Sequence, residues 1–167
     1  VAITLLLVAT AASAAPVDIS ADEISRNADG VIIAKGNVII KRDNETLRAD
    51  EVLYRSAEKI LQARGNVVIE SPQATIEADD AIIQTNSKTG NMSKATIILP
   101  DGSRLVAERV KRIDDQSFEA EELTFSACHI DEESWSIAAS KALLDQEDGS
   151  LTVEHSRFQL WGVPVLY

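Results

Sequence analysis

The sequence AKGNVII at residues 34–40 decides the fold class, because it returns almost unchanged as ARGNVVI at residues 63–69. The two copies lie 29 residues apart. Small or apolar residues occupy every second position of both copies, and this alternation is typical of β-strands with one buried face. A glycine inside such a strand usually marks a bulge or a corner. We therefore predict strands that turn a corner at Gly36 and Gly65.

A second motif, alanine followed by an acidic residue, recurs with the same period. Its copies are residues 21–24 (ADEI), 49–52 (ADEV), 78–81 (ADDA) and 107–110 (AERV), with a weaker fifth copy at Ala139. Two interleaved motifs at one period indicate a repeat architecture, in which each unit buries its apolar face against its neighbours. We predict an all-β, repeat-built β-jellyroll, an open, solenoid-like stack of short antiparallel strands folded into two facing sheets. Residues 51–62 are the best helical candidate, and a weak one.

Length and charge exclude several classes of protein. The chain has 167 residues, about one domain's worth, and a net charge of −11 from 16 basic and 27 acidic residues. Such an acidic surface is a poor match for nucleic acid, which needs clustered cations. It also repels anionic lipid head groups, so the acyl chains of any anionic lipid ligand must supply the affinity.

The first residues match a secretory signal. Residues 1–8 are apolar apart from Thr4, and small residues follow up to Pro16, with Ala-Ser-Ala at 12–14 fitting the cleavage pattern. A hydrophobic first strand and a membrane anchor are the alternatives, but the stretch is shorter than the ~20 residues that span a bilayer. We expect a signal peptide at residues 1–14, truncated at its start, and an exported protein.

Nothing in the sequence requires catalysis. Cys128 is the single cysteine, and His129 and His155 are the two histidines. A zinc site needs three or four ligands at recognisable spacings, and a catalytic cysteine needs a histidine and an orienting group. The acidic runs at 114–115, 119–122 and 131–133 lack the calcium-loop pattern and fit solvated surface better. We predict no enzymatic activity, no cofactor and no metal.

The C-terminal stretch adds motifs that differ from the repeat: FSAC at 125–128, WSIAA at 135–139 and GVPVLY at 162–167. With these motifs the chain resembles the N-terminal periplasmic (OstA-like) domain of the outer-membrane lipopolysaccharide-assembly family, LptD. The repeat alone would fit the whole superfamily, including the soluble bridge component LptA. The resemblance covers nearly all of the chain after the signal.

The resemblance implies a location, a function and partners. Residues 15–160 would form the jellyroll in the periplasm of a Gram-negative bacterium, and 161–167 would begin the connection to a C-terminal β-barrel in the outer membrane. The domain would receive lipopolysaccharide from an LptA-like bridge protein and pass its acyl chains to that barrel, which the lipoprotein LptE plugs. The edge strand that pairs with the bridge protein would comprise Val17, Asp18, Ile19, Ser20, Ala21, Asp22, Glu23 and Ile24.

Cys128 lies where the family carries a disulfide cysteine. The second cysteine that the family places near the N-terminus is missing here. The resemblance implies a single bridge to a cysteine in the barrel, and a buried free thiol is the alternative.

The lipid path would consist of interior aliphatic and aromatic side chains. Burying one methylene group contributes about 0.8 kcal/mol, so several acyl chains bind strongly along a continuous apolar groove. For each single residue, ordinary core packing is the alternative. The candidates are Ile32, Val38, Ile40, Leu61, Val67, Ile69, Ile76, Ile97, Leu99, Phe125 and Ile137.

Two other functions stay open. A soluble bridge protein of the LptA kind would have the same fold and ligand without a barrel. A structural β-solenoid or adhesin would have a dry, closed core and would bind no lipid.

Overall fold

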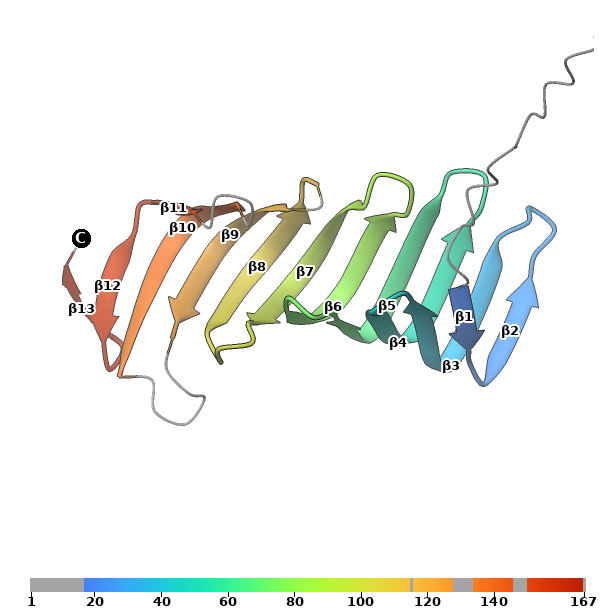
Figure 1. Cartoon of the computed structure of the whole chain (residues 1–167), viewed down its shortest axis with the longest axis horizontal. Helices are drawn as coiled ribbons and strands as arrows, with labels where there is room; N and C mark the ends of the chain where they lie inside the picture. Colours follow the sequence, from blue (N-terminus) through green and yellow to red (C-terminus); the bar gives the residue numbers. More distant parts are fainter. Residues whose placement is uncertain (1–16, 115, 128–133, 146–149, 167) are drawn as a thin grey trace, which may run out of the picture.

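The computed structural model describes residues 17–114, 116–127, 134–145 and 150–166, and in these residues the chain is all-β. The described strands form one 13-stranded antiparallel sheet (Figure 1). The strands are β1 (Val17–Ser20), β2 (Glu23–Arg26), β3 (Ile32–Arg42), β4 (Glu45–Arg55), β5 (Ile60–Glu70), β6 (Thr75–Gln84), β7 (Thr89–Ile98), β8 (Arg104–Arg112), β9 (Ser117–Ser126), β10 (Trp135–Asp145), β11 (Ser150–Glu154), β12 (Arg157–Leu160) and β13 (Val163–Leu166).

Strand order follows the chain from β3 to β10, and it branches at both ends. At the N-terminal end β1 and β2 pair with different halves of β3, and at the C-terminal end β11 and β12 pair with different halves of β10. β13 then pairs with β12. The all-β, repeat-built prediction is confirmed. The helical candidate at 51–62 is instead the end of β4, a turn and the start of β5.

Each long strand turns a corner near its middle. In β3 and β5 the corner is a two-residue bulge, with φ of 72° at Gly36 and Gly65 and 47° at Asn37 and Asn66. A Cβ at Gly36 would collide with the Asp22 carboxylate, so the site accepts only glycine. The predicted corners at Gly36 and Gly65 are therefore confirmed.

The two interleaved sequence motifs meet at this corner. Asn37 Nδ2 donates a hydrogen bond to Asp22 Oδ2 at 2.9 Å, and Asn66 Nδ2 donates to Asp50 Oδ2 at 2.8 Å. The acidic residue of one motif therefore fixes the Gly-Asn bulge of the other motif on the next strand.

The third repeat replaces this hydrogen bond with an ion pair. Lys94, with φ of 47°, lies at the corner of β7, where the register with β6 continues without a bulge, and its Nζ lies 3.1 Å from Asp79 Oδ2. A charged pair therefore substitutes for the amide–carboxylate pair at the same corner.

The corners fold one continuous sheet into two arms, where we had predicted two sheets of short strands. The first arm carries the hairpin turns at 56–59 and 85–88, and the second arm carries those at 43–44 and 71–74. The strands from β3 to β10 have 9 to 11 residues because each one runs through the bend into both arms. The two facing layers are thus joined along the whole bend.

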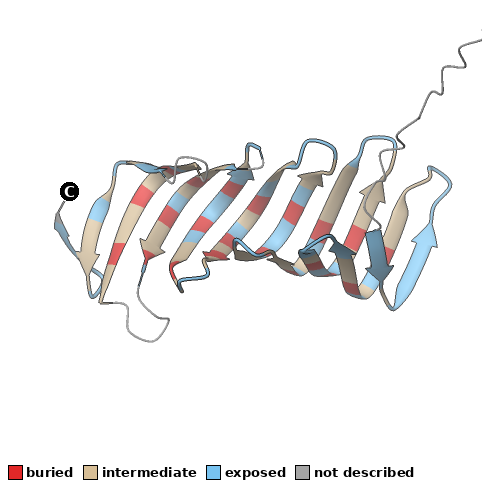
Figure 2. Cartoon of the chain, in the orientation of Figure 1, coloured by how far each residue is buried: buried red, intermediate tan, exposed pale blue. Residues whose placement is uncertain are grey.

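Small side chains fill the inside of the bend. One row follows the register from strand to strand without a break, and Figure 2 shows buried positions repeating across the strands. Its members are Ala34, Val52, Ala63, Ala81, Met92, Val110, Ala120 and Ala142. Alanine at most of these positions lets the two arms approach closely at the bend, and the arms diverge from there.

Candidate functional site: an apolar groove between the two arms

A continuous row of large apolar side chains runs along the inner face of the second arm, one residue per strand. We call it the second-arm row. The sheet register gives its members in order as Ile19, Ile40, Leu47, Ile69, Ile76, Ile97, Leu105, Phe125, Ile137 and Phe158. Because neighbouring strands lie about 4.8 Å apart, the row is roughly 40 Å long. Leu47 and Ile97 are each 8 % exposed, and Ile19 at the edge is 42 % exposed.

A second row lies on the inner face of the first arm. We call it the first-arm row. The register gives its members as Ile32, Tyr54, Leu61, Ile83, Gly90, Arg112, Phe118, Leu144 and Leu151. The row is apolar at both ends and is interrupted at Gly90 and Arg112.

The two rows face each other across a groove. A cavity of about 370 Å³ is lined by Ile40, Ile69 and Ile76 from the second arm and by Ile83 and Phe118 from the first. This volume lies in the range of small-molecule and lipid sites, about 300–1,000 Å³. The lining side chains are half-buried, so the groove has an apolar wall on both sides and remains accessible.

The structure places the eleven predicted lipid-path residues as follows. Six belong to the second-arm row: Ile40, Ile69, Ile76, Ile97, Phe125 and Ile137. Ile32 and Leu61 belong to the first-arm row, and Leu99 packs against the core just after β7. Val38 and Val67 are each 1 % exposed, so they pack the inside of the bend and present almost no surface to the groove.

Sequence reasoning missed several groove residues. Leu47, Leu105 and Phe158 complete the second-arm row, and Tyr54, Ile83 and Phe118 belong to the first-arm row. Their strands carry apolar residues on both faces, which hides the alternation. Counting outward from the bend motif on each strand would have found them, because the bend sets the register.

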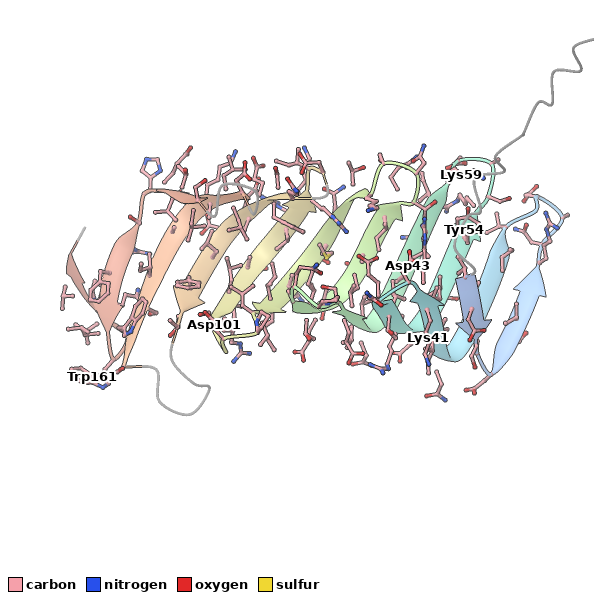
Figure 3. The ribbon with its side chains drawn as sticks, in the orientation of Figure 1. Lys41, Asp43, Tyr54, Lys59, Asp101 and Trp161 are labelled. Atoms are coloured by element: carbon pink, nitrogen blue, oxygen red, sulfur yellow. The ribbon has the colours of Figure 1, made fainter. Side chains whose placement is uncertain are left out.

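The groove ends in an aromatic cluster at its C-terminal end. The ring centroids of Phe125 and Trp135 lie 6.3 Å apart at a steep angle, and those of Trp135 and Phe158 lie 5.9 Å apart and nearly parallel. Beyond them Trp161 is 76 % exposed (Figure 3). The groove therefore changes from aliphatic to aromatic walls as it approaches β12.

Both ends of the sheet are edges in the described part of the chain. The predicted edge strand at 17–24 consists of two short strands, β1 and β2, which are separated at Ala21 and Asp22 by the bend. Both pair only with β3 among the described strands, so their other sides carry backbone groups that are able to pair with an added strand. Val17 and Ile24 on these strands are 52 % and 54 % exposed.

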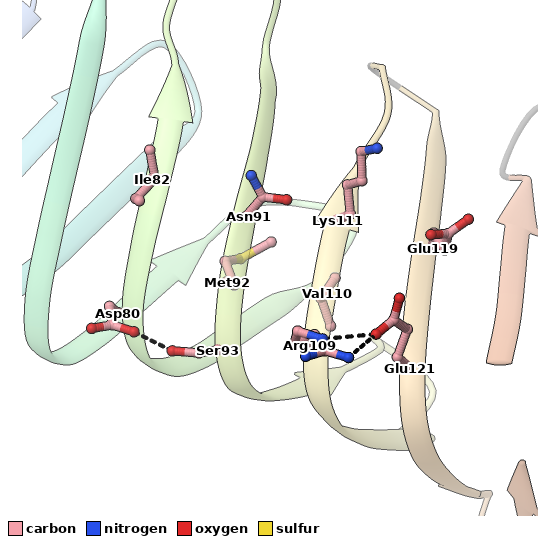
Figure 4. A pocket seen from close by; sticks show the side chains of 10 residues that line it. All are labelled: Asp80, Ile82, Asn91, Met92, Ser93, Arg109, Val110, Lys111, Glu119 and Glu121. Atoms are coloured by element: carbon pink, nitrogen blue, oxygen red, sulfur yellow. Dashed lines mark hydrogen bonds and ion pairs between the residues drawn. The ribbon is translucent and has the colours of Figure 1, made fainter. Parts of the chain in front are cut away.

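The outer face of the first arm differs completely from the groove. Charges alternate along the register, with Lys35 Nζ 3.3 Å from Glu51 Oε1. Figure 4 shows the same pattern further along, where Arg109 pairs with Glu121 and Ser93 donates a hydrogen bond to Asp80. These groups line a shallow hollow of about 300 Å³. Because these ion pairs lie at the surface, they keep this face of the sheet hydrated and contribute little binding energy.

Two predictions fall on residues outside the described ranges: the signal peptide at 1–14, and the disulfide at Cys128 with its neighbour His129. Within the described ranges, no group of three or more His, Cys, Asp or Glu side chains is placed to hold a metal ion. None of the described segments forms a helix with the length and apolarity needed to cross a bilayer.

Comparison with known proteins agrees with the sequence resemblance. The chain is 29 % identical over 153 residues to the LPS-assembly protein LptD of Nitrosococcus oceani. The matched residues cover 91 % of this chain and 21 % of that protein. It is also 29 % identical to LptD of Sodalis glossinidius, over 99 % of this chain and 22 % of the relative. The chain thus spans about a fifth of the length of the curated relatives it matches. No protein-family profile matches the chain.

Among solved structures, the chain matches LptH, described as the LptA-homologous periplasmic component of the lipopolysaccharide transport device of Pseudomonas aeruginosa. The TM-score is 0.35 and the identity 10 %, over 83 % of this chain and 82 % of LptH. A TM-score this low does not show that the two chains share a fold.

The sheet and its groove define the class of the protein: an open, repeat-built β-jellyroll with an apolar interior. Within that class the chain is similar to the LPS-assembly protein LptD over nine tenths of its length, which confirms the resemblance inferred from its motifs.

Proposed function

We propose that this domain carries lipopolysaccharide, with the acyl chains held between the two arms and the sugars outside the groove. The single observation that supports this most strongly is the second-arm row, which offers an unbroken apolar wall roughly 40 Å long at the strand spacing of about 4.8 Å. The lipid itself is suggested by the relatives, which are named for lipopolysaccharide assembly.

Transport along the groove requires that the lipid binds with similar energy at successive positions. Each methylene moved from water into the groove contributes about 0.8 kcal/mol, so several acyl chains are held firmly. Moving the lipid by one strand exchanges one isoleucine or leucine for another, for example Ile69 for Ile76. The energy therefore changes little from step to step, and the lipid moves along the groove without leaving it.

The two edges supply the ends of the route. β1 and β2 would pair with the terminal strand of an LptA-like bridge protein, which would place the bridge's interior in line with Ile19 and Ile40. The opposite end would lead to the protein's own C-terminal β-barrel with its lipoprotein LptE, in the outer membrane of a Gram-negative cell. In the same proposal, residues 1–14 are the signal, 15–160 the jellyroll and 161–167 the connection, and Cys128 forms a disulfide with the barrel.

The two rival functions fit less well. A structural β-solenoid requires a dry, closed core, whereas this fold has a groove of about 370 Å³ with half-buried walls. A soluble bridge protein would share the groove, but the curated relatives named here are LptD proteins.

Site-specific photocrosslinking in cells tests the proposal. A photoreactive residue at Ile69 or Phe125 should form lipopolysaccharide adducts, because both side chains line the inner face. The matched controls are Val68 and Thr124, the preceding residues on the same strands, which lie on the outer face. Equal labelling of inner and outer positions would contradict a lipid path between the arms, and no labelling in folded and exported protein would support the structural solenoid instead.

A further inference from the structure

The interruption of the first-arm row is a built feature of the fold. Gly90 on β7 and Arg112 on β8 are direct partners in the register, between Ile83 on one side and Phe118 on the other. A Cβ on Gly90 would lie 2.6 Å from the backbone oxygen of Ile82, so a side chain there requires the backbone to move. The row therefore has no side chain at one position and a cation at the next.

The groove cavity lies at this interruption. Gly90 and Arg112 both line it, together with Ile83 and Phe118 of the same arm. The backbone of Gly90 lies close against β6 and lines the cavity on the first arm, and the isoleucines of the second arm line the opposite side. A ligand in the cavity therefore touches apolar walls and the arginine at once.

Arg112 is held in place by its neighbours. Its guanidinium carbon lies 5.6 Å from the centre of the Phe118 ring, a cation–π contact, and its Nε donates a hydrogen bond to the backbone oxygen of Asp114 at 3.0 Å. The side chain is half-buried. An arginine fixed in this way loses little conformational freedom when it binds an anion.

Two further cations line the same cavity. Lys88 lies in the turn between β6 and β7, and Arg42 lies at the tip of the facing hairpin, with its Nε 3.9 Å from Asp43 Oδ2 (Figure 3 labels Asp43). Asp43 and Glu45 are the acidic groups of the lining. The cavity thus has three cations and two acids, in a chain whose net charge is −11.

We propose that Gly90 and Arg112 form a station for an anionic lipid head group, with a phosphate bound by Arg112 and flanked by Lys88 and Arg42. The acyl chains of the same molecule would lie against Ile69, Ile76 and Ile83. A guanidinium binds phosphate through two parallel hydrogen bonds, which a neutral head group cannot accept with equal strength. The inference rests on the proposed function of the groove, and it adds a position where phosphorylated lipids are distinguished from neutral ones.

Binding measurements on the whole chain test the station. The probes are lipid A with two phosphates and its dephosphorylated form, in the same detergent, with inorganic phosphate as a third ligand. We expect the phosphorylated form to bind more tightly, and Arg112→Gln to weaken its binding about tenfold or more, the loss of one charge-assisted contact. Binding of the dephosphorylated form should not change. Arg112→Lys should retain part of the preference.

Lys111→Gln is the matched control, because it removes one positive charge from the adjacent residue on the outer face of the same strand. It should leave both affinities unchanged. Comparing two lipids on one variant also separates a loss of recognition from a loss of folding, since misfolding would weaken both.

Each contrary outcome has its own meaning. Equal binding of both lipids, unchanged in Arg112→Gln, would overturn the station and leave the lipid groove standing. If neither lipid binds, the proposed function and the station are overturned together. Tight binding of inorganic phosphate alone, lost in Arg112→Gln, would show a small-anion site and overturn the head-group assignment.

Discussion

The amide of Asn66 donates a hydrogen bond to the carboxylate of Asp50 at 2.8 Å, across the bend where β5 meets β4. Asp22 and Asn37 repeat the contact one unit earlier at 2.9 Å. The same carboxylates also cover Gly36 and Gly65, where a side chain would collide with them. The bend that creates the groove therefore depends on a short motif, repeated with the period of the sequence.

Removing this contact should destabilise the fold. Asp50→Ala and Asn66→Ala should each lower the free energy of unfolding by about 1 kcal/mol, the usual net value of such a hydrogen bond. In a double-mutant cycle the two losses should not add, because both variants remove the same bond. Urea unfolding followed by circular dichroism measures this, with the exposed turn variant Glu58→Ala as the control. Fully additive losses would show that the contact contributes nothing.

A charge in the second-arm row should block transport. Ile69→Asp places a carboxylate on the apolar wall, where it costs free energy to desolvate and repels an anionic lipid. Lipopolysaccharide adducts at position 125, further along the row, should then fall severalfold. Val68→Asp places the same charge on the outer face of the same strand and should leave those adducts unchanged. An equal loss in both variants would point to misfolding.

Trp135 should report lipid at the C-terminal end of the groove. Trp161→Phe leaves Trp135 as the only tryptophan, stacked on Phe158 with ring centroids 5.9 Å apart. Acyl chains that reach the aromatic cluster should shift its fluorescence emission to shorter wavelength. Trp135→Phe keeps the exposed Trp161 and should show a much smaller change. Emission that stays the same in Trp161→Phe at saturating lipid would exclude the cluster from the path.

Two turns should lose stability in acid. Backbone N–H groups of Gln116 and Ser117 donate to the Asp114 carboxylate and lower its pKa below the ordinary 3.8, and the N–H of Ser103 does the same for the pKa of Asp101. A carboxyl whose pKa is lower in the folded state stabilises the fold above its unfolded pKa. That contribution is therefore fully present at neutral pH and is lost as the pH falls below about 3.8 towards the folded value.

Unfolding of Asp114→Asn as a function of pH measures this contribution. The variant should lose less stability than the original chain as the pH falls from neutral to below the ordinary carboxyl pKa of 3.8, because it has no carboxyl to protonate at this turn. Identical pH profiles for the two proteins would contradict the assignment.

The all-β fold and the corners could be predicted from sequence because the repeated motif places a glycine at each corner. Gly36 and Gly65 stand where only glycine fits. Contacts between strands could not be predicted, because a single sequence does not reveal register. Val38 and Ile40 illustrate this, since they alternate identically along β3, yet one is sealed in the bend at 1 % exposure and the other lines the groove. Gly90 and Arg112 were missed because β7 lacks the Gly-Asn-Val motif, so the sequence did not place residue 90 or its partner on the groove face.

The most direct test of the lipid path follows lipopolysaccharide along the second-arm row over time. Photoreactive residues at Ile40, Ile97 and Phe125 mark its start, middle and end, and illumination at intervals after a pulse of labelled lipopolysaccharide records occupancy. Adducts should appear first at 40, then at 97 and last at 125, and the outer-face position 124 should stay unlabelled. Simultaneous labelling of all four positions, or no labelling of the inner three in folded protein, would contradict a lipid path between the arms.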